Sequence, residues 1–269
     1  MARVPLPRRQ TMAVPANAAV PRYHSLLAVD IKAFNDQRRD QEIRSSLRTA
    51  MYELLAGAFA RSGLPWPSCY HEDRGDGVLV IAPAGAPAAV LLYPFVEHLR
   101  AGIRRYNRYR IEPAQLWLRA AVHAGQVCFD RHGVSGGAVT YLFRMLEAPA
   151  FKRALDASGA DFALVTSDAV FQDVVLSGTG LIDPDMYAPV QVRCKETRSQ
   201  AWLYLPPVRN PALGGAAGRR RPQAATQLRD MAQVIRRRSA TVSAALSKLA
   251  ADQGPRRSAG MSRQQAAAG

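Results

Sequence analysis

Two aspartates stand in settings in which a carboxylate can do chemistry. Asp30 follows the apolar run 26–29, where a buried strand would end, and Asp76 lies between two glycines in a turn that separates two strand-like runs. Mg²⁺ and Mn²⁺ prefer oxygen ligands and are commonly held by a few carboxylates together with phosphate oxygens. The pair therefore indicates a divalent-metal site for a triphosphate, and the alternative is two solvated turn residues.

Four short motifs follow one another along the chain. They are 30–34 (DIKAF), 75–77 (GDG), 118–127 (LRAAVHAGQV) and 136–146 (GGAVTYLFRML). In this order they resemble the catalytic domain of class III nucleotidyl cyclases, over residues 22–205. The resemblance implies an α+β fold of the ferredoxin-like split βαβ type, with a mixed or antiparallel sheet and flanking helices. It also implies an enzyme that makes a 3′,5′-cyclic nucleotide second messenger from a nucleoside triphosphate and releases pyrophosphate.

The resemblance assigns the metal and phosphate positions. Asp30 and Asp76 correspond to the metal ligands, with the carbonyl of Ile31 assisting, and each site would hold two Mg²⁺ or Mn²⁺ ions. Two metal ions can activate the 3′-hydroxyl, neutralise the α-phosphoryl charge and stabilise the leaving group. The backbone near the phosphates would be that of Lys32, Ala33 and Phe34. Ala33 stands where the family has glycine.

The resemblance also assigns three side chains that act on the substrate. Arg144 corresponds to the arginine that stabilises charge on the phosphoryl group, and its alternative reading is a helix-surface arginine. Lys195 corresponds to a lysine that holds the terminal phosphates, where the alternative is a solvated lysine at a strand end. Thr140 replaces the asparagine that orients the ribose, with a shorter reach and fewer hydrogen-bonding groups.

The positions that read the base depart furthest from the purine cyclases. They fall on Glu72 and Gly133, and Gly133 offers no side chain. Adenylate cyclases place lysine and aspartate or threonine there, and guanylate cyclases place glutamate and cysteine. We therefore favour UTP or CTP over ATP and GTP, with Glu72 or Arg74 reading the base edge. In its size and in this departure the chain resembles the pyrimidine cyclases of bacterial anti-phage systems, which act through a separate effector.

In the family, the metal aspartates of one protomer face the arginine and base-reading residues of another, so the resemblance implies a head-to-tail homodimer with composite sites. A catalytically silent domain that binds a nucleotide or a partner is the second hypothesis, supported by Thr140 and Gly133. The retained aspartates and Arg144 favour an active enzyme. The two histidines nearest these motifs, His71 and His123, lack a catalytic partner at motif spacing and are interpreted as structural or as supporting residues behind the site. No Walker-type or dinucleotide-binding glycine loop occurs, which excludes P-loop and Rossmann functions.

Charge is concentrated at the ends of the 269-residue chain. The net charge is +15, but 207–269 hold twelve Lys or Arg against two acids and 1–20 hold three arginines, which leaves about +2 for 21–206. A nucleic-acid-binding protein with a basic tail is the third hypothesis, but the arginines of the tail lack interleaved aromatics, so we do not expect nucleic-acid binding there. Three separated cysteines indicate a reducing compartment, and prolines interrupt the longest apolar stretch and the N-terminus. We expect a soluble, cytoplasmic protein without a membrane span or signal peptide.

These observations divide the chain into a flexible leader (1–20), a catalytic domain (21–206) and a basic tail (207–269), mostly disordered with a possible helix at 224–251. Periodicity within the domain predicts an order of β-α-β-β-α-β with additional elements. The expected strands are 23–31, 69–73, 77–82, 116–123, 126–129, 162–166, 190–194 and 201–204. The expected helices are 39–61, 88–109, 138–146, 150–157 and a short helix after Ser167, ending at 175.

Overall fold

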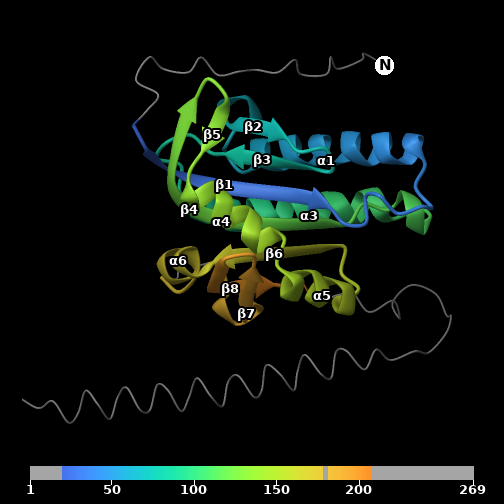
Figure 1. Ribbon diagram of the computed structural model, residues 1–269. Helices are drawn as coiled ribbons and strands as arrows, with labels where there is room; N and C mark the ends of the chain where they lie inside the picture. Colours follow the sequence, from blue (N-terminus) through green and yellow to red (C-terminus); the bar gives the residue numbers. More distant parts are fainter. Residues whose placement is uncertain (1–19, 178–180, 207–269) are drawn as a thin grey trace, which may run out of the picture. The chain divides into compact units, whose positions relative to one another are not determined.

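A computed structural model describes residues 20–177 and 181–206 (Figure 1). The predicted basic tail with its helix at 224–251 lies outside the described residues, as does the predicted leader apart from Val20. No helix in the described part of the chain is long and apolar enough to cross a membrane.

One mixed sheet organises the domain. Its strands follow the order β2-β3-β1-β4-β6-β8-β7, and β5 pairs with β4 at its side. All pairings are antiparallel except β4 with β6. In Figure 1 the sheet extends from β2 and β3 at the top to β7 and β8 at the bottom. The strands are β1 (Arg22–Ile31), β2 (Tyr70–Asp73), β3 (Gly77–Ile81), β4 (Leu118–Asp130), β5 (Gly133–Ser135), β6 (Phe162–Ser167), β7 (Tyr187–Cys194) and β8 (Thr197–Tyr204).

Helices cover both faces of this sheet, which confirms the predicted α+β class. The helices are α1 (Gln41–Arg61), α2 (Ala88–Leu92), α3 (Phe95–Asn107), α4 (Gly137–Leu146), α5 (Pro149–Ser158) and α6 (Asp168–Val170), which continues as a π-helix over Phe171–Val175. Short 3₁₀ helices span Trp66–Ser68, Glu112–Ala114 and Pro184–Met186.

Strand β1 lies between two hydrophobic cores, one on each face of the sheet. Successive side chains of a strand point to opposite faces, so Leu27, Val29 and Ile31 join the core beneath α1, α2 and α3. Leu26 and Ala28 join the core beneath α4 and α5. This double burial explains why the sequence before Asp30 is continuously apolar. The same alternation places Asp30 on the face that α4 covers.

Two predicted elements were wrong in extent. The expected helix 88–109 is two helices, because α2 ends before Tyr93, whose backbone is extended, and Pro94 precedes α3. A proline in a helix interior lacks the N–H for one hydrogen bond and clashes with the preceding turn. The expected strand pair around Gly125 is the single strand β4, since Gly125 continues the antiparallel pairing opposite His24.

Gly125 serves packing rather than a turn. A Cβ at this position would lie 2.8 Å from the Cβ of Ala138, which is on α4. Only glycine therefore lets α4 approach β4 this closely. The predicted cap of the short helix after β6 is confirmed, because the hydroxyl of Ser167 accepts a hydrogen bond from the amide of Val170.

Candidate active site

The fold brings Asp30 and Asp76 together at the end of β1. Asp30 pairs with Gly77 in the antiparallel ladder, and the amide of Ile31 donates a hydrogen bond of 2.8 Å to the carbonyl of Asp76. A Cβ on Gly77 would lie 2.3 Å from the carbonyl oxygen of Val29. Glycine after Asp76 is thus required for the hairpin to reach β1. The sequence places the two aspartates 46 positions apart, and the β1–β3 pairing makes them neighbours.

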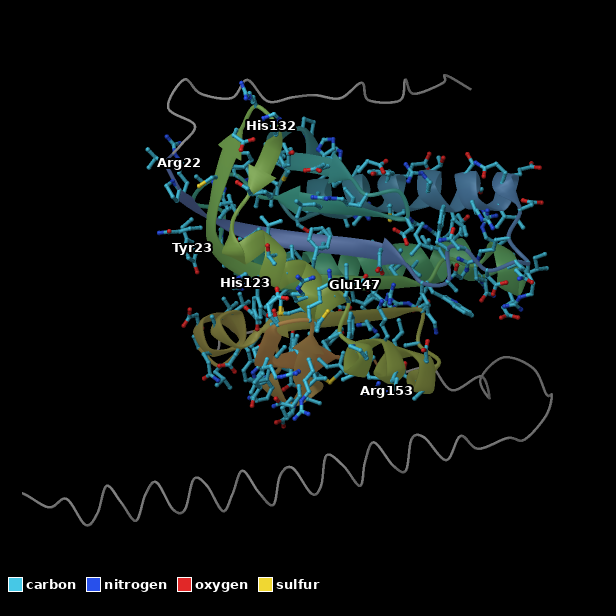
Figure 2. All side chains as sticks on the ribbon, in the orientation of Figure 1. Arg22, Tyr23, His123, His132, Glu147 and Arg153 are labelled. Carbon is cyan, nitrogen blue, oxygen red and sulfur yellow. The ribbon has the colours of Figure 1, made fainter. Side chains whose placement is uncertain are left out.

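Asp30 is buried and ion-paired. Asp30 is only 6% exposed, and Arg119 donates to its carboxylate from Nε (2.8 Å) and Nη2 (2.6 Å). Burial raises the pKa of Asp30 to about 6, although Arg119 lowers it; the negative charges of Asp76 and Glu147 add to the rise. Glu147, labelled in Figure 2, directly follows α4. A buried carboxylate with further carboxylates nearby needs a cation, and Arg119 supplies one.

The donor set fits a divalent ion shared with phosphate. Among the described residues no group of three or more His, Cys, Asp or Glu side chains could hold a metal by itself. Mg²⁺ is usually bound by one or two carboxylates plus substrate phosphates, so Asp30 and Asp76 would be sufficient protein ligands. The guanidinium of Arg119 already occupies a cation position on both oxygens of Asp30. Hard oxygen donors of this kind favour Mg²⁺ or Mn²⁺ over zinc.

The turn after β1 has a conformation that suits glycine. Ala33 has φ of 55°, in the left-handed region, which explains why a glycine would be expected there. The amide of Lys32 donates to the carbonyl of Trp117 (2.8 Å), and the buried Arg39 donates to the carbonyl of Lys32 (3.0 Å). The side chain of Lys32 pairs with Asp156 at 2.7 Å. These contacts fix the backbone of the turn beside the aspartates, while Phe34 packs against the core.

A second group of predicted residues lies on α4 and on the β7–β8 turn. Thr140 and Arg144 are one helical turn apart, and Thr140 is exposed. Arg144 donates from Nη2 to Glu196 at 2.9 Å, while its buried Nε has no partner among the described residues. Glu196 follows Lys195, which is exposed and has φ of 50° in the turn. The fold thus brings Arg144 and the Lys195 turn together.

The aspartates at the end of β1 and the residues on α4 and the β7–β8 turn are not joined within one chain. No hydrogen bond or ion pair between described residues links Arg144, Thr140 or Lys195 to Asp30 or Asp76.

The predicted base-reading positions do meet, and they meet at Tyr70. A Cβ on Gly133 would lie 3.4 Å from the hydroxyl of Tyr70 and 3.7 Å from Oε2 of Glu72. Tyr70 donates to that same oxygen of Glu72 at 3.0 Å. Arg74 pairs with the other carboxylate oxygen at 3.3 Å, and its guanidinium lies 5.1 Å from the centre of the Phe143 ring. The phenol of Tyr70 therefore lies against the place where a side chain at position 133 would begin.

Sequence reasoning missed Arg119 and Tyr70. Arg119 could have been singled out as the one charge in the otherwise apolar segment 116–122. Tyr70 gave no signal, because its role depends on the β4–β5 hairpin lying beside β2. The two histidines have local partners: His123 Nδ1 lies 2.9 Å from the hydroxyl of Ser167, and His71 lies against Trp66 with ring centroids 4.7 Å apart.

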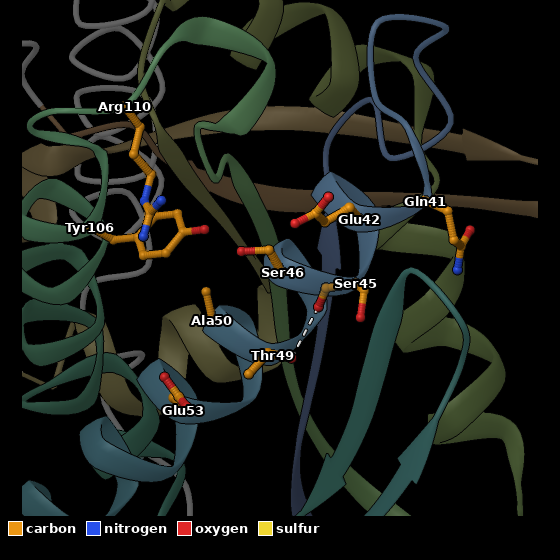
Figure 3. A pocket seen from close by; sticks show the side chains of 9 residues that line it. All are labelled: Gln41, Glu42, Ser45, Ser46, Thr49, Ala50, Glu53, Tyr106 and Arg110. Carbon is orange, nitrogen blue, oxygen red and sulfur yellow. Dashed lines mark hydrogen bonds between the residues drawn. The ribbon is translucent and has the colours of Figure 1, made fainter. Parts of the chain in front are cut away.

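A groove of about 750 Å³ lies elsewhere, between α1 and the end of α3 (Figure 3). Polar side chains line it, and none of the predicted site residues is among them. The lining residues are Gln41, Glu42, Ser45, Ser46, Thr49, Ala50, Glu53, Tyr106 and Arg110.

Comparison with solved structures decides the fold. The adenylate/guanylate cyclase/hydrolase from Silicibacter pomeroyi superposes with a TM-score of 0.50 at 16% identity, covering 70% of this chain and 98% of that chain. The fold is that of a class III cyclase catalytic domain. The resemblance expected from the four motifs is thereby confirmed for the cyclase fold.

Two further cyclase structures resemble the chain at similar levels of identity. The guanylyl cyclase Cya2 has a TM-score of 0.49 at 14% identity and covers 69% of this chain and 92% of its own. The guanylate cyclase domain of RhGC from Catenaria anguillulae, in complex with GTP, has a TM-score of 0.47 at 16% identity. The match covers 68% of this chain and 96% of that chain. No protein-family model matches the sequence. No curated protein matches it either.

Proposed function

We propose that this cyclase-fold protein is an active nucleotidyl cyclase, which converts a nucleoside triphosphate into a 3′,5′-cyclic nucleotide and pyrophosphate. The observation that carries the proposal is the pairing of β1 with β3, which puts Asp30 and Asp76 side by side at one end of the sheet. Two carboxylates in this arrangement, one buried and one half-exposed, suit a metal-assisted attack on a phosphate.

The chain's own groups have distinct tasks in this reaction. Asp30, Asp76 and the carbonyl of Ile31 would hold two Mg²⁺ or Mn²⁺ ions. When bound, these ions would lower the pKa of the 3′-hydroxyl and neutralise charge on the α-phosphate. Arg119 now holds both carboxylate oxygens of Asp30 and would have to leave them for the ions to bind, after which its guanidinium could donate to a phosphate. The backbone of the turn at Lys32, Ala33 and Phe34 borders the same space.

A second copy of the chain would complete the site. Arg144 would stabilise the phosphoryl charge, Thr140 would orient the ribose, and Lys195 would hold the terminal phosphates. Two features support this arrangement: Thr140 and Lys195 are exposed, and Arg144 is joined to the Lys195 turn through its hydrogen bond to Glu196. A permanently charged, planar guanidinium with donors to spare suits a phosphate that arrives from a neighbouring protomer.

The substrate would be a pyrimidine nucleotide, UTP or CTP. Gly133 contributes no side chain, and the Tyr70 hydroxyl reaches into the place that a larger residue would take. The remaining polar groups, Tyr70, Glu72 and Arg74, form one connected set. Sites that hydrogen-bond a base edge reject mismatched bases strongly. The cyclic product would act as a second messenger through a separate effector, and the role in anti-phage defence belongs to the same proposal.

The decisive experiment offers the protein each of the four nucleoside triphosphates with Mn²⁺ and identifies the products by mass spectrometry. A cyclic pyrimidine nucleotide with pyrophosphate is expected, and its formation should fall at least about 100-fold in Asp76→Ala. Clean conversion of ATP or GTP alone would refute the pyrimidine assignment but leave the cyclase intact. Replacing Glu72 with Ala should alter the ranking of substrates more than the dependence on metal.

The competing function is a silent cyclase-fold domain that binds nucleotide without turning it over. The full engagement of Asp30 by Arg119 favours this candidate, because the ion pair must open before a metal ion can bind. Equilibrium binding of a triphosphate analogue, measured beside the product assay, separates the two functions. Binding without product would establish the silent domain.

A further inference from the structure

The end of α3 and the residues after it form a basic surface with exposed apolar side chains. The stretch RRYNRYRI contains four arginines and no acid. Arg104, Arg105 and Arg108 are exposed, and their spacing places them on one side of the helix. Tyr109 (86% exposed) and Ile111 (72% exposed) are the most exposed large hydrophobic side chains of the described residues. These five residues are named the α3 patch.

The arginines of the α3 patch are not held in ion pairs by neighbouring acids. None of its arginines forms an ion pair with a carboxylate of the described residues. Glu112, which directly follows Ile111 in the sequence, is bound by Arg38 at 3.1 Å. Asp161 is partly buried and interacts electrostatically with Arg104. In a domain with a net charge of only about +2, this segregation of arginines is pronounced.

The helix dipole accounts for only part of this composition. Basic residues in the last turn of a helix interact favourably with its negative end, so Arg104 and Arg105 have a local benefit. Tyr109 and Ile111 follow the helix and face water, and no such benefit applies to them. The guanidinium of Arg108 lies 5.0 Å from the centre of the Tyr109 ring, which keeps charge and apolar surface adjacent.

We propose that the α3 patch docks the protein on the surface of an anionic lipid bilayer. Arginine forms charge-assisted hydrogen bonds to phosphates, tyrosine is favoured at the depth of the headgroups, and an exposed isoleucine gains by entering the acyl region. The contact is peripheral, because no helix among residues 20–177 and 181–206 could cross the membrane. The docking is independent of the proposed catalysis and uses none of its residues.

A nucleic acid fits the α3 patch less well than a membrane does. Single-strand binding depends on several aromatic rings on which successive bases stack. Tyr109 is the one fully exposed ring of the patch, since Tyr106 is half-buried beneath the guanidinium of Arg110, 3.9 Å from the ring centre. Ile111 would have no part in stacking. The aliphatic side chain therefore favours lipid.

The test is co-sedimentation of the full chain with phosphatidylcholine vesicles, with and without roughly 30 mol% phosphatidylserine. Anionic lipid recruits basic surfaces, so the difference between the two vesicles measures the contribution of charge. Two double variants probe the patch: Arg105→Gln with Arg108→Gln, and Tyr109→Ser with Ile111→Ser. The control, Arg22→Gln with Arg153→Gln, removes the same charge from exposed positions remote in sequence (Figure 2). All variants keep residues 207–269, whose charge of +10 then contributes equally.

Both patch variants should lower partitioning onto anionic vesicles at least about tenfold, against less than about twofold for the control. Compared with wild type, which has three tryptophans, Ile111→Trp should show additional emission that is blue-shifted and quenched by brominated lipid when vesicles are added. Equal losses in patch and control variants would overturn the proposal, as would a tryptophan that stays in water. Loss of single-stranded RNA binding with vesicle binding intact would also overturn it and assign the patch to nucleic acid.

Discussion

Arg119 forms two hydrogen bonds to Asp30, of 2.8 and 2.6 Å, across the β1–β4 pairing, and both side chains are mostly buried. Asp30 therefore contributes to the stability of the domain through this ion pair, and it is also a proposed metal ligand. Removing one partner of a buried ion pair leaves an uncompensated charge, whereas removing both can be nearly neutral.

We therefore predict that Asp30→Ala destabilises the domain by about 3 kcal/mol and abolishes product formation. The double variant Asp30→Ala with Arg119→Ala should recover most of the stability and none of the activity. Urea unfolding gives the double-mutant cycle, and product analysis gives turnover. Asp76→Ala is the matched control, since it removes a half-exposed proposed ligand with little expected change in stability. Additive stability effects of the two substitutions would contradict a coupled pair.

The second prediction concerns subunit sharing. Asp30→Asn and Arg144→Ala should each be inactive alone, because each lacks one half of the proposed composite site. Mixed dimers would contain one site free of both substitutions, so activity should return towards about a quarter of the wild-type level for random mixing. Titration of one variant against the other measures the recovery. If labelled subunits exchange and activity stays absent, the shared-site model is wrong.

The third prediction tests the close approach of α4 to β4. Gly125→Ala should destabilise the domain by about 1–3 kcal/mol, because the new Cβ would lie 2.8 Å from that of Ala138. The displaced helix carries Thr140 and Arg144, so turnover should also fall. Gly137→Ala is the control: it lies at the start of the same helix with no heavy atom within 4 Å of its added Cβ. Thermal unfolding of the two variants checks the difference, and equal melting temperatures would count against the tight contact.

The fourth prediction concerns pH. Burial lowers the pKa of His123 to about 4, from 6.5. Between these values the unfolded chain binds a proton that the folded chain does not, so the free energy of unfolding should decrease as pH falls from 6.5 to 4. His123→Gln should flatten this dependence by about 1–2 kcal/mol, since partial exposure of the ring reduces the effect.

The comparison must be made between wild type and variant, by urea unfolding at pH 4.5 and 7.5. Asp30, whose pKa is raised from 3.8 to about 6, acts in the opposite direction over a similar range. Its stabilising contribution is present at low pH and is lost as pH rises through about 6. A pH dependence that is identical with and without His123 would exclude this histidine as the source.

Local features of the sequence were sufficient for most elements and for the order of the motifs. Continuous apolar residues before Asp30 indicated a buried strand, and the spacing in 39–61 indicated α1. Ser167 signalled the helix start after β6 because capping is a contact between near neighbours. Motif order predicted the cyclase fold without any knowledge of contacts.

Only the tertiary structure decided which side chains meet. Asp30 and Arg119 are 89 positions apart, and their ion pair exists because β1 and β4 are paired in one particular register. Tyr70 fills the space beside Gly133 only because the β4–β5 hairpin lies next to β2. The sequence suggested a break at Gly125, yet Gly125 continues β4 opposite His24 and is glycine because α4 packs against it. Such contacts depend on packing between distant segments, which residue spacing along the chain does not encode.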